Sequence, residues 1–380
     1  MSTEIEDTHI VPRRSPPSLE TFTFEAASSQ VIDQGNSLMA KNAKRENRKF
    51  HTLEHPEGMQ RKAERLADIL GLSMEQKKRG SMAIAWHDTI INKDSPLADN
   101  IIGSIKRHRG SREGDQPAGI NGNEAKSADV MEESMREVNV KAGKKIFSAD
   151  DFRIQRLSID ATYPAVEGGS NFQGLPFNEY PYFKEIILEN PQAANIFVQL
   201  EETGITKGIL FYQPHMEIPL EAGEQIPLEV FAVAQADLGT AGMDGREAFF
   251  LEGDLEYQEL HENINPENLK RLLEDTQEQD EVDRRKVLED MIKWLYSQPS
   301  FAAFQYLRSL KMVGLMEKNA QINNDQVVKL KEATTGKSHD SISAAIERAK
   351  SIEGKVKSLI KPGDSRDALA YIAKEMHYSL

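Results

Sequence analysis

The chain has 380 residues, of which 39% are hydrophobic and 28% charged, and its 61 acidic and 47 basic side chains leave a net charge of −14. This balance argues against a sequence-independent nucleic-acid binder, because such proteins gain affinity by neutralising phosphates. The absence of cysteine excludes disulfides, thiolate metal sites, iron–sulfur clusters and cysteine nucleophiles. No apolar run approaches the ~18 residues of a membrane span, and no signal peptide is evident, so we expect a soluble, cytoplasmic protein.

The first third of the chain predicts helices behind a loose arm. Residues 1–18 are polar and contain consecutive prolines, which favours a flexible N-terminal arm. A helical pattern follows from Leu19 to about Ala43. A second helix is predicted over residues 52–70, with Pro56 in its first turn, where proline is least disruptive.

A third helix is predicted directly after the second. Gly71 is suited to end one helix and Ser73 to cap the next, which we expect to run through about Ile91. Its segment MAIAW is apolar on nearly every face, so this helix is predicted to be central.

The remaining elements alternate between helix and irregular chain. Residues 92–122 are rich in Gly, Asp and Asn and contain the basic run KRHRGSR, and helical patterns return at NEAKSADVMEESMREV and SADDFRIQRLSIDATYP. The proline-rich segment 164–226 contains GILFYQ, which is typical of a short strand. We therefore predict an all-α bundle over 19–163 and 227–315, interrupted by an irregular insertion that could form a short β-hairpin. Residues 316–380 are predicted to be a C-terminal helical extension.

Two short fragments carry the residues with chemical potential. His51 and His55 are four positions apart, which places them on one helical face, as a metal clamp, a catalytic couple or an ordinary surface pair would require. Asp88 follows His87 at the end of an apolar helix. Burying a carboxylate without a partner is costly, so a cation, either an arginine or a metal ion, is expected to compensate Asp88.

Five motifs in order resemble the HD superfamily of metal-dependent phosphohydrolases, in particular its bacterial branch with HTLxH, HD, NExxSA and DLG motifs. The motifs are FHTLEH at 50–55, WHD at 86–88, NEAKSA at 123–128, IDAT at 159–162 and ADLG at 236–239. The stretch GDLEYQEL stands where that branch has an REY-type segment. The resemblance covers about residues 25–310, and it implies an HD-type helical core.

The same resemblance implies that one divalent cation is held by four side chains, namely His55, His87, Asp88 and Asp237. Two imidazoles and two carboxylates without sulfur suit Mn²⁺, Fe²⁺, Co²⁺, Ni²⁺, Mg²⁺ or Zn²⁺. Open coordination positions would let the ion acidify water and polarise a phosphoryl oxygen. The segment HDTII lacks the further histidine that two-metal members carry, so a single ion is favoured.

Two further residues are predicted to act on protons. His51 matches the position that protonates the leaving oxygen in phosphodiesterase-like relatives, or it orients Glu124 or a phosphate. Glu124 matches the glutamate of NExxSA. It is expected to accept a proton or to hold His51, and the alternative is a carboxylate that only favours the start of its helix.

Basic residues near these motifs are candidates for substrate binding. Arg107 and Arg109 belong to the basic loop between the HD and NExxSA motifs, which either collects an anionic substrate or is simply solvated. Lys126, inside NExxSA, is the other predicted phosphate contact. Because the insertion 164–226 enters after IDAT and leaves before Asp237, it is also a candidate lid over the active site.

The predicted function is that of a metal-dependent phosphohydrolase acting on a nucleotide or another small phosphorylated compound. The alternative is a non-catalytic metal- and nucleotide-binding HD scaffold that works through a protein partner. A di-iron HD oxygenase ranks last, because it needs more histidine ligands. The long insertion and the C-terminal extension depart from the family pattern and leave the substrate open, and a homo-oligomer also stays open.

Overall fold

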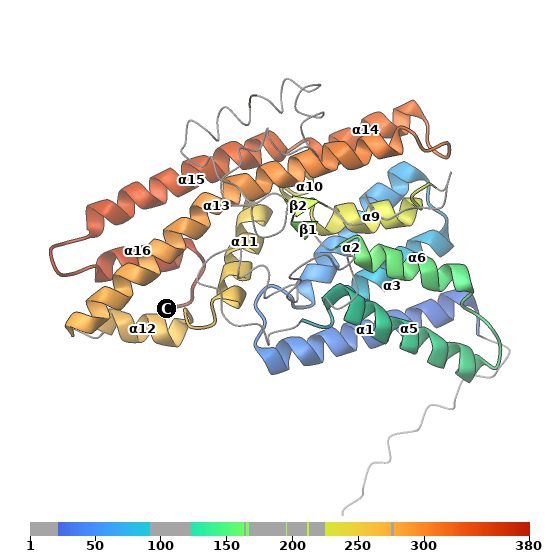
Figure 1. The fold of residues 1–380 in the computed structure, drawn as a ribbon, viewed down its shortest axis with the longest axis horizontal. Coiled ribbons are helices and arrows are strands. Elements are labelled where there is room, and N and C mark those ends of the chain that lie inside the picture. Colours follow the sequence, from blue (N-terminus) through green and yellow to red (C-terminus); the bar gives the residue numbers. More distant parts are fainter. Residues whose placement is uncertain are drawn as a thin grey trace, which may run out of the picture.

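The computed structural model describes residues 22–91, 123–162, 165–166, 195, 211–212, 225–274 and 277–380 (Figure 1). The helices lie at α1 (Phe24–Glu46), α2 (Glu54–Leu70), α3 (Met74–Trp86), α5 (Asn123–Ala142), α6 (Ala149–Asp160), α9 (Leu228–Asp237), α10 (Thr240–Met243), α11 (Arg246–Leu260), α12 (Pro266–Glu274), α13 (Glu278–Met316), α14 (Asn324–Thr335), α15 (Ser338–Leu359) and α16 (Arg366–Glu375). The all-α prediction is confirmed. No described helix is both long and apolar enough to cross a lipid bilayer.

The predicted helix boundaries depend on local capping, and most are close to those in the structure. The first helix begins later than expected, at Phe24, where the Thr23 side chain accepts a hydrogen bond from the Ala26 N–H. Gly71 ends α2 in the left-handed conformation, with φ of 70°. Ser73 begins α3 with a capping box shared with Gln76.

The α3 helix lies in the middle of the N-terminal helices, as its apolar sequence predicts. It packs against α1, α2, α6 and α9, and Met82, Ala83, Ile84, Ala85 and Trp86 are all buried. The helix ends at Trp86 instead of about Ile91. The Thr89 hydroxyl and N–H both donate to the Trp86 carbonyl, and Asn42 donates to the Thr89 carbonyl, so the chain turns directly after the HD dipeptide.

The long helix α13 joins the two ends of the molecule (Figure 1). Its second half contributes Met312, Val313 and Met316 to a core shared with α2, α6, α9 and α14. Its first half contributes Leu288 and Trp294 to a second core shared with α11, α12, α15 and α16. The buried apolar residues of α13 therefore serve core packing, and residues 316–380 pack along α13.

Within the insertion, the structure describes only residues 165–166, 195, 211–212 and 225–226. The strand β1 (Ala165–Val166) pairs antiparallel with β2 (Phe211–Tyr212), with Ala165 opposite Tyr212. The strand predicted in GILFYQ is thus present at residues 211–212. A lid formed by residues 164–226 lies outside what the structure describes.

The close packing of α1 on α3 provides a test of the fold around the HD motif. The Trp86 indole donates to the Val31 carbonyl at 2.9 Å, and a Cβ atom at Gly35 would lie 2.7 Å from the indole nitrogen. We expect Gly35→Ala to lower the free energy of unfolding by about 1–3 kcal/mol, because the added methyl group overpacks this contact. Urea denaturation followed by circular dichroism measures the change.

Gly58→Ala is the matched control, because a Cβ atom there meets only Arg61, at 3.8 Å. Alanine has the higher helix propensity, so Gly58→Ala is expected to stabilise the protein by up to about 1 kcal/mol. Equal effects of the two substitutions would contradict the packing described for Gly35.

Candidate metal centre

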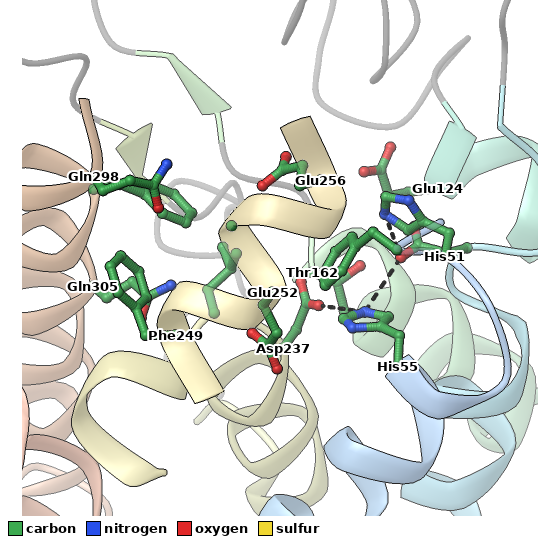
Figure 2. Close-up of a pocket in the computed structure, with 15 residues that line it drawn as sticks. His51, His55, Glu124, Thr162, Asp237, Phe249, Glu252, Glu256, Gln298 and Gln305 are labelled. Carbon is green, nitrogen blue, oxygen red and sulfur yellow. Dashed lines mark ion pairs between the residues drawn. The ribbon is translucent and has the colours of Figure 1, made fainter. Parts of the chain in front are cut away.

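The four predicted metal ligands come from three helix ends that meet at one point. His55 lies in the first turn of α2, His87 and Asp88 follow α3, and Asp237 is the last residue of α9. One ligand atom from each residue lies within 4.8 Å of the other three. Figure 2 shows His55 and Asp237 facing each other across this point. The structure therefore brings together the full set that the motif resemblance implied.

The separations between the ligand atoms suit a shared cation. The His55 Nε2 atom lies 3.1 Å from His87 Nε2, 3.3 Å from Asp237 Oδ1 and 3.5 Å from Asp88 Oδ2. His87 Nε2 lies 2.9 Å from Asp88 Oδ2. With metal–ligand bonds of about 2.1 Å, neighbouring ligands are roughly 3.0 Å apart in octahedral and roughly 3.4 Å apart in tetrahedral coordination. The donor set thus fits a divalent metal ion.

The orientation of His87 is set by the backbone. Its Nδ1 atom lies 2.8 Å from the Ile84 carbonyl oxygen, which can only accept, so Nδ1 carries the proton and donates. In the neutral ring this leaves the lone pair on Nε2, the atom that faces the other ligands. Arg48 fixes the neighbouring turn, because its guanidinium donates to the Asp88 carbonyl at 2.8 Å. Such contacts orient ligands before a metal binds.

The pKa shifts of Asp88 and His87 indicate that the four candidate ligands need a positive charge among them. Burial disfavours the ionised carboxyl of Asp88, but the adjacent imidazoles of His87 and His51 outweigh burial and hold its pKa well below the usual range. Burial likewise lowers the pKa of the His87 imidazole, but Asp88 and Asp237 outweigh it and raise that pKa to about 9. Without a metal ion, a proton on His87 therefore balances part of the carboxylate charge.

His51 lies beside the ligand cluster and is held by a residue that the sequence analysis did not assign. Its Nδ1 atom lies 2.8 Å from Oε1 of Glu259, and its Nε2 atom lies 3.4 Å from Asp88 Oδ2. The other oxygen of Glu259 accepts hydrogen bonds from three consecutive backbone N–H groups, those of Lys49, Phe50 and His51, at 2.9 to 3.0 Å. Glu259 lies in the singled-out stretch GDLEYQEL, but no local spacing links it to His51, 208 residues away.

Of the other predicted site residues, the structure describes Glu124 and Lys126. Glu124 is buried and lines the pocket beside His51 and His55 (Figure 2). Lys126 is exposed on α5 and is not among the residues that line the pocket. Arg107 and Arg109 lie outside the described residues.

Two further motif residues have structural partners at the site. Ser127 of NEAKSA accepts a hydrogen bond from the Ile90 N–H at 3.1 Å, which ties α5 to the turn after the HD dipeptide. Thr162 of IDAT lines the pocket, and its hydroxyl donates to the Ile159 carbonyl at the end of α6.

The ligand cluster opens into a pocket that extends to α11 and α13. The space between its lining residues is about 650 Å³ when open solvent is included. It is lined by Phe50, His51, His55, Asp88, Glu124, Thr162, Asp237, Leu238, Phe249, Glu252, Gly253, Glu256, Gln298, Phe301 and Gln305. The cluster therefore lies beside a pocket that is partly open to solvent.

Comparisons with protein-family models, with curated proteins and with solved structures found no match for this chain. The resemblance to the HD superfamily therefore rests on the five motifs, and HD membership stays a prediction.

Metal binding provides a test with a defined pH dependence. Because the pKa of His87 is raised to about 9, the proton is held below that pH, and a cation must displace it. We expect about one equivalent of Mn²⁺ per chain, with an apparent affinity that rises about tenfold per pH unit up to about pH 9. Calorimetric titrations at pH 6.5, 7.5 and 8.5 measure both quantities.

His87→Ala is expected to abolish this binding, and His339→Ala serves as the control because His339 lies on α15, outside the cluster. An affinity that does not change with pH, or full binding by His87→Ala, would contradict the assignment.

The role of Glu259 is tested by Glu259→Gln. An amide has one acceptor oxygen and no charge, so the variant cannot accept hydrogen bonds from both the backbone N–H groups and a protonated His51 Nδ1 atom. We expect a loss of about 1–3 kcal/mol in the free energy of unfolding. The pKa of His51 is raised in the wild type, since Glu259 and Asp88 outweigh the effect of burial, and we expect it to fall in the variant.

Denaturation and NMR titration of the histidine rings in metal-free protein measure the two effects. Glu247→Gln, an exposed change on the same helix, should alter neither the stability nor the His51 titration. The assignment fails if Glu259→Gln behaves like this control.

Proposed function

We propose that this protein is an HD-type metal-dependent phosphohydrolase that cleaves a phosphoester of a nucleotide or another small phosphorylated compound. The observation that carries the proposal is the convergence of His55, His87, Asp88 and Asp237 beside a pocket, with His51 next to them. The five ordered motifs support the same reading.

A single divalent cation is proposed for these four ligands, and Mn²⁺, Fe²⁺, Co²⁺, Ni²⁺, Mg²⁺ and Zn²⁺ all suit two imidazoles and two carboxylates. Such an ion would supply a Lewis acid for a phosphoryl oxygen and would lower the pKa of water at the site. His55, His87, Asp88 and Asp237 are all largely buried, so they would hold the ion where water competes little.

We assign the leaving-group proton to His51. Its Nδ1 atom is occupied by Glu259, so the proton that it can transfer is the one on Nε2, on the side of Asp88. In the reaction, the oxygen of a water molecule bonds to phosphorus and the bond from phosphorus to the alcohol oxygen breaks. The alcohol oxygen takes the proton from His51, and the proton released by water goes to Glu124, which lines the same pocket.

A non-catalytic scaffold acting through a protein partner is the alternative. The C-terminal helices offer it little support, because α14, α15 and α16 pack against α13 and against other helices of the chain. In the part of the chain that the structure describes, residues 316–380 do not form a separate docking arm (Figure 1).

Hydrolysis of a phosphoester panel tests the proposal. With Mn²⁺, Co²⁺ or Ni²⁺ present, we expect release of phosphate from at least one small phosphoester. Asp88→Asn should lower kcat/KM by at least about 100-fold by weakening the metal site, and His51→Ala by about 100- to 10,000-fold. Phosphate release and bound metal are measured on the same samples.

His339→Ala, away from the pocket, should retain wild-type turnover. Metal-loaded protein that hydrolyses nothing in the panel would overturn the proposal and would favour the non-catalytic alternative.

A further inference from the structure

Arg308 is a buried cation to which the proposed chemistry gives no role. It lies in the second half of α13, and its side chain is fully buried. Its Nη2 atom donates to the Ala234 carbonyl, whereas Nε and Nη1 have no hydrogen-bond partner within the described chain. No carboxylate of the described residues forms an ion pair with it either. A buried charge without a contacting partner is costly, so its surroundings should explain why it is there.

The contact with Ala234 places the guanidinium at the C-terminal end of α9. Ala234 precedes Asp237 by three positions, and Asp237 is both the last residue of that helix and a candidate metal ligand. The carbonyls of a last helical turn carry partial negative charge, which a guanidinium offsets. Burial lowers the pKa of Arg308 to about 9, while the charge of Asp237 acts in the opposite direction, so the side chain is cationic at neutral pH.

Two neighbouring contacts hold this part of α13 against the turn that carries the ligand. Ser309 accepts a hydrogen bond from the Gln235 side chain, and Gln305 accepts one from the Ala241 N–H at 2.9 Å. These contacts join α13 to the chain on both sides of Asp237. Arg308 itself is not among the residues that line the pocket, so its charge acts there through space and not by touching a ligand.

The pocket lining offers an anion no cation of its own in the part of the chain that the structure describes. Its residues include no lysine or arginine. Lys62 lies nearby, but its ammonium is 3.7 Å from the Glu252 carboxylate and donates to the Thr240 hydroxyl at 2.6 Å. The charge of Lys62 is therefore already compensated, whereas that of Arg308 is not.

The charge of Arg308 gains importance once the four ligands hold a cation. The carboxylates of Asp88 and Asp237 balance a divalent ion, and imidazoles bind a metal in their neutral form. The ligand set alone would thus leave no excess charge to attract an anion. Arg308 adds one positive charge next to Asp237, in a buried place where solvent screens it little.

We propose that Arg308 is the counter-charge of the candidate metal centre, which weakens the binding of the cation and strengthens the binding of a phosphoryl group to the loaded centre. The phosphoryl group rests on the proposed function, whereas the effect on the cation rests on Arg308 and the four ligands. The two effects have opposite signs. A purely structural role would not produce this pattern, because a damaged site binds both partners less tightly.

The first experiment measures Mn²⁺ affinity by calorimetry at pH 7.0, and so does not depend on hydrolysis. Arg308→Met removes the charge and keeps an apolar stem, and Arg308→Gln removes the charge but keeps an amide donor for the Ala234 carbonyl. We expect each variant to bind Mn²⁺ about 3- to 10-fold more tightly than the wild type, because the repulsion between guanidinium and cation is lost. Two variants keep the test decisive if one of them does not fold.

Arg284→Met is the matched control. Arg284 is also a buried arginine of α13, and it also donates to a backbone carbonyl in the last turn of a helix, that of Leu272 in α12, at 2.7 Å. It belongs neither to the ligand cluster nor to the pocket lining. Its Mn²⁺ affinity should equal that of the wild type, and circular dichroism confirms that each variant is folded.

The second experiment measures the binding of inorganic phosphate to the Mn²⁺-loaded proteins. We expect Arg308→Met and Arg308→Gln to bind phosphate about 10-fold more weakly than the wild type, because an attractive charge is lost. Arg284→Met should bind phosphate as tightly as the wild type does.

The outcomes separate this inference from the proposed function. Unchanged or weaker Mn²⁺ affinity in the Arg308 variants overturns the inference, and so does unchanged phosphate affinity or a loaded wild type that binds no phosphate. Ester hydrolysis by the wild type together with any of these results leaves the phosphohydrolase proposal intact. Both expected shifts without turnover of any ester would do the reverse, and a wild type that binds no Mn²⁺ overturns both.

Discussion

Two carboxylates, Asp88 and Asp237, face two imidazoles inside a helical bundle, and their charge has to be balanced there. In water these groups would be solvated, but here they are largely enclosed and share one small space. An ionised carboxylate in such a place requires a positive partner, whether a proton on His87 or a metal ion. The requirement applies where α2, α3 and α9 meet, because each of these helix ends places a candidate ligand at that point.

Glu259 links the segment before α2 to α11, and α11 in turn contacts the C-terminal helices. Its carboxylate, on α11, accepts three backbone N–H groups from the segment that leads into α2 and also holds the His51 ring. The same helix is anchored from the C-terminal side, where Arg348 of α15 forms paired hydrogen bonds with the fully buried Asp254. The C-terminal helices therefore support α11, and through Glu259 they support the residue beside the metal centre.

The four candidate metal ligands lie together, and Asp88 and Asp237 among them also line the pocket. At this point a metal ion would offset the carboxylates and attract a phosphate. A net charge of −14 is thus compatible with a phosphorylated ligand, because a metal ion bound to the four candidate ligands would attract the phosphate locally.

The sequence by itself determined what depends on neighbouring residues: the capped helices, the buried apolar face of α3, and ligand types whose order along the chain resembles a known family. Capping and apolar periodicity act over a few positions, so Gly71, Ser73 and the MAIAW segment could be interpreted without a structure. Only the tertiary structure decided that Glu259 holds His51, that Lys126 is exposed and outside the pocket lining, and that Gln298 lies over Gly253. The Glu259 and Gln298 contacts join segments far apart in the chain, so no local sequence pattern encodes them.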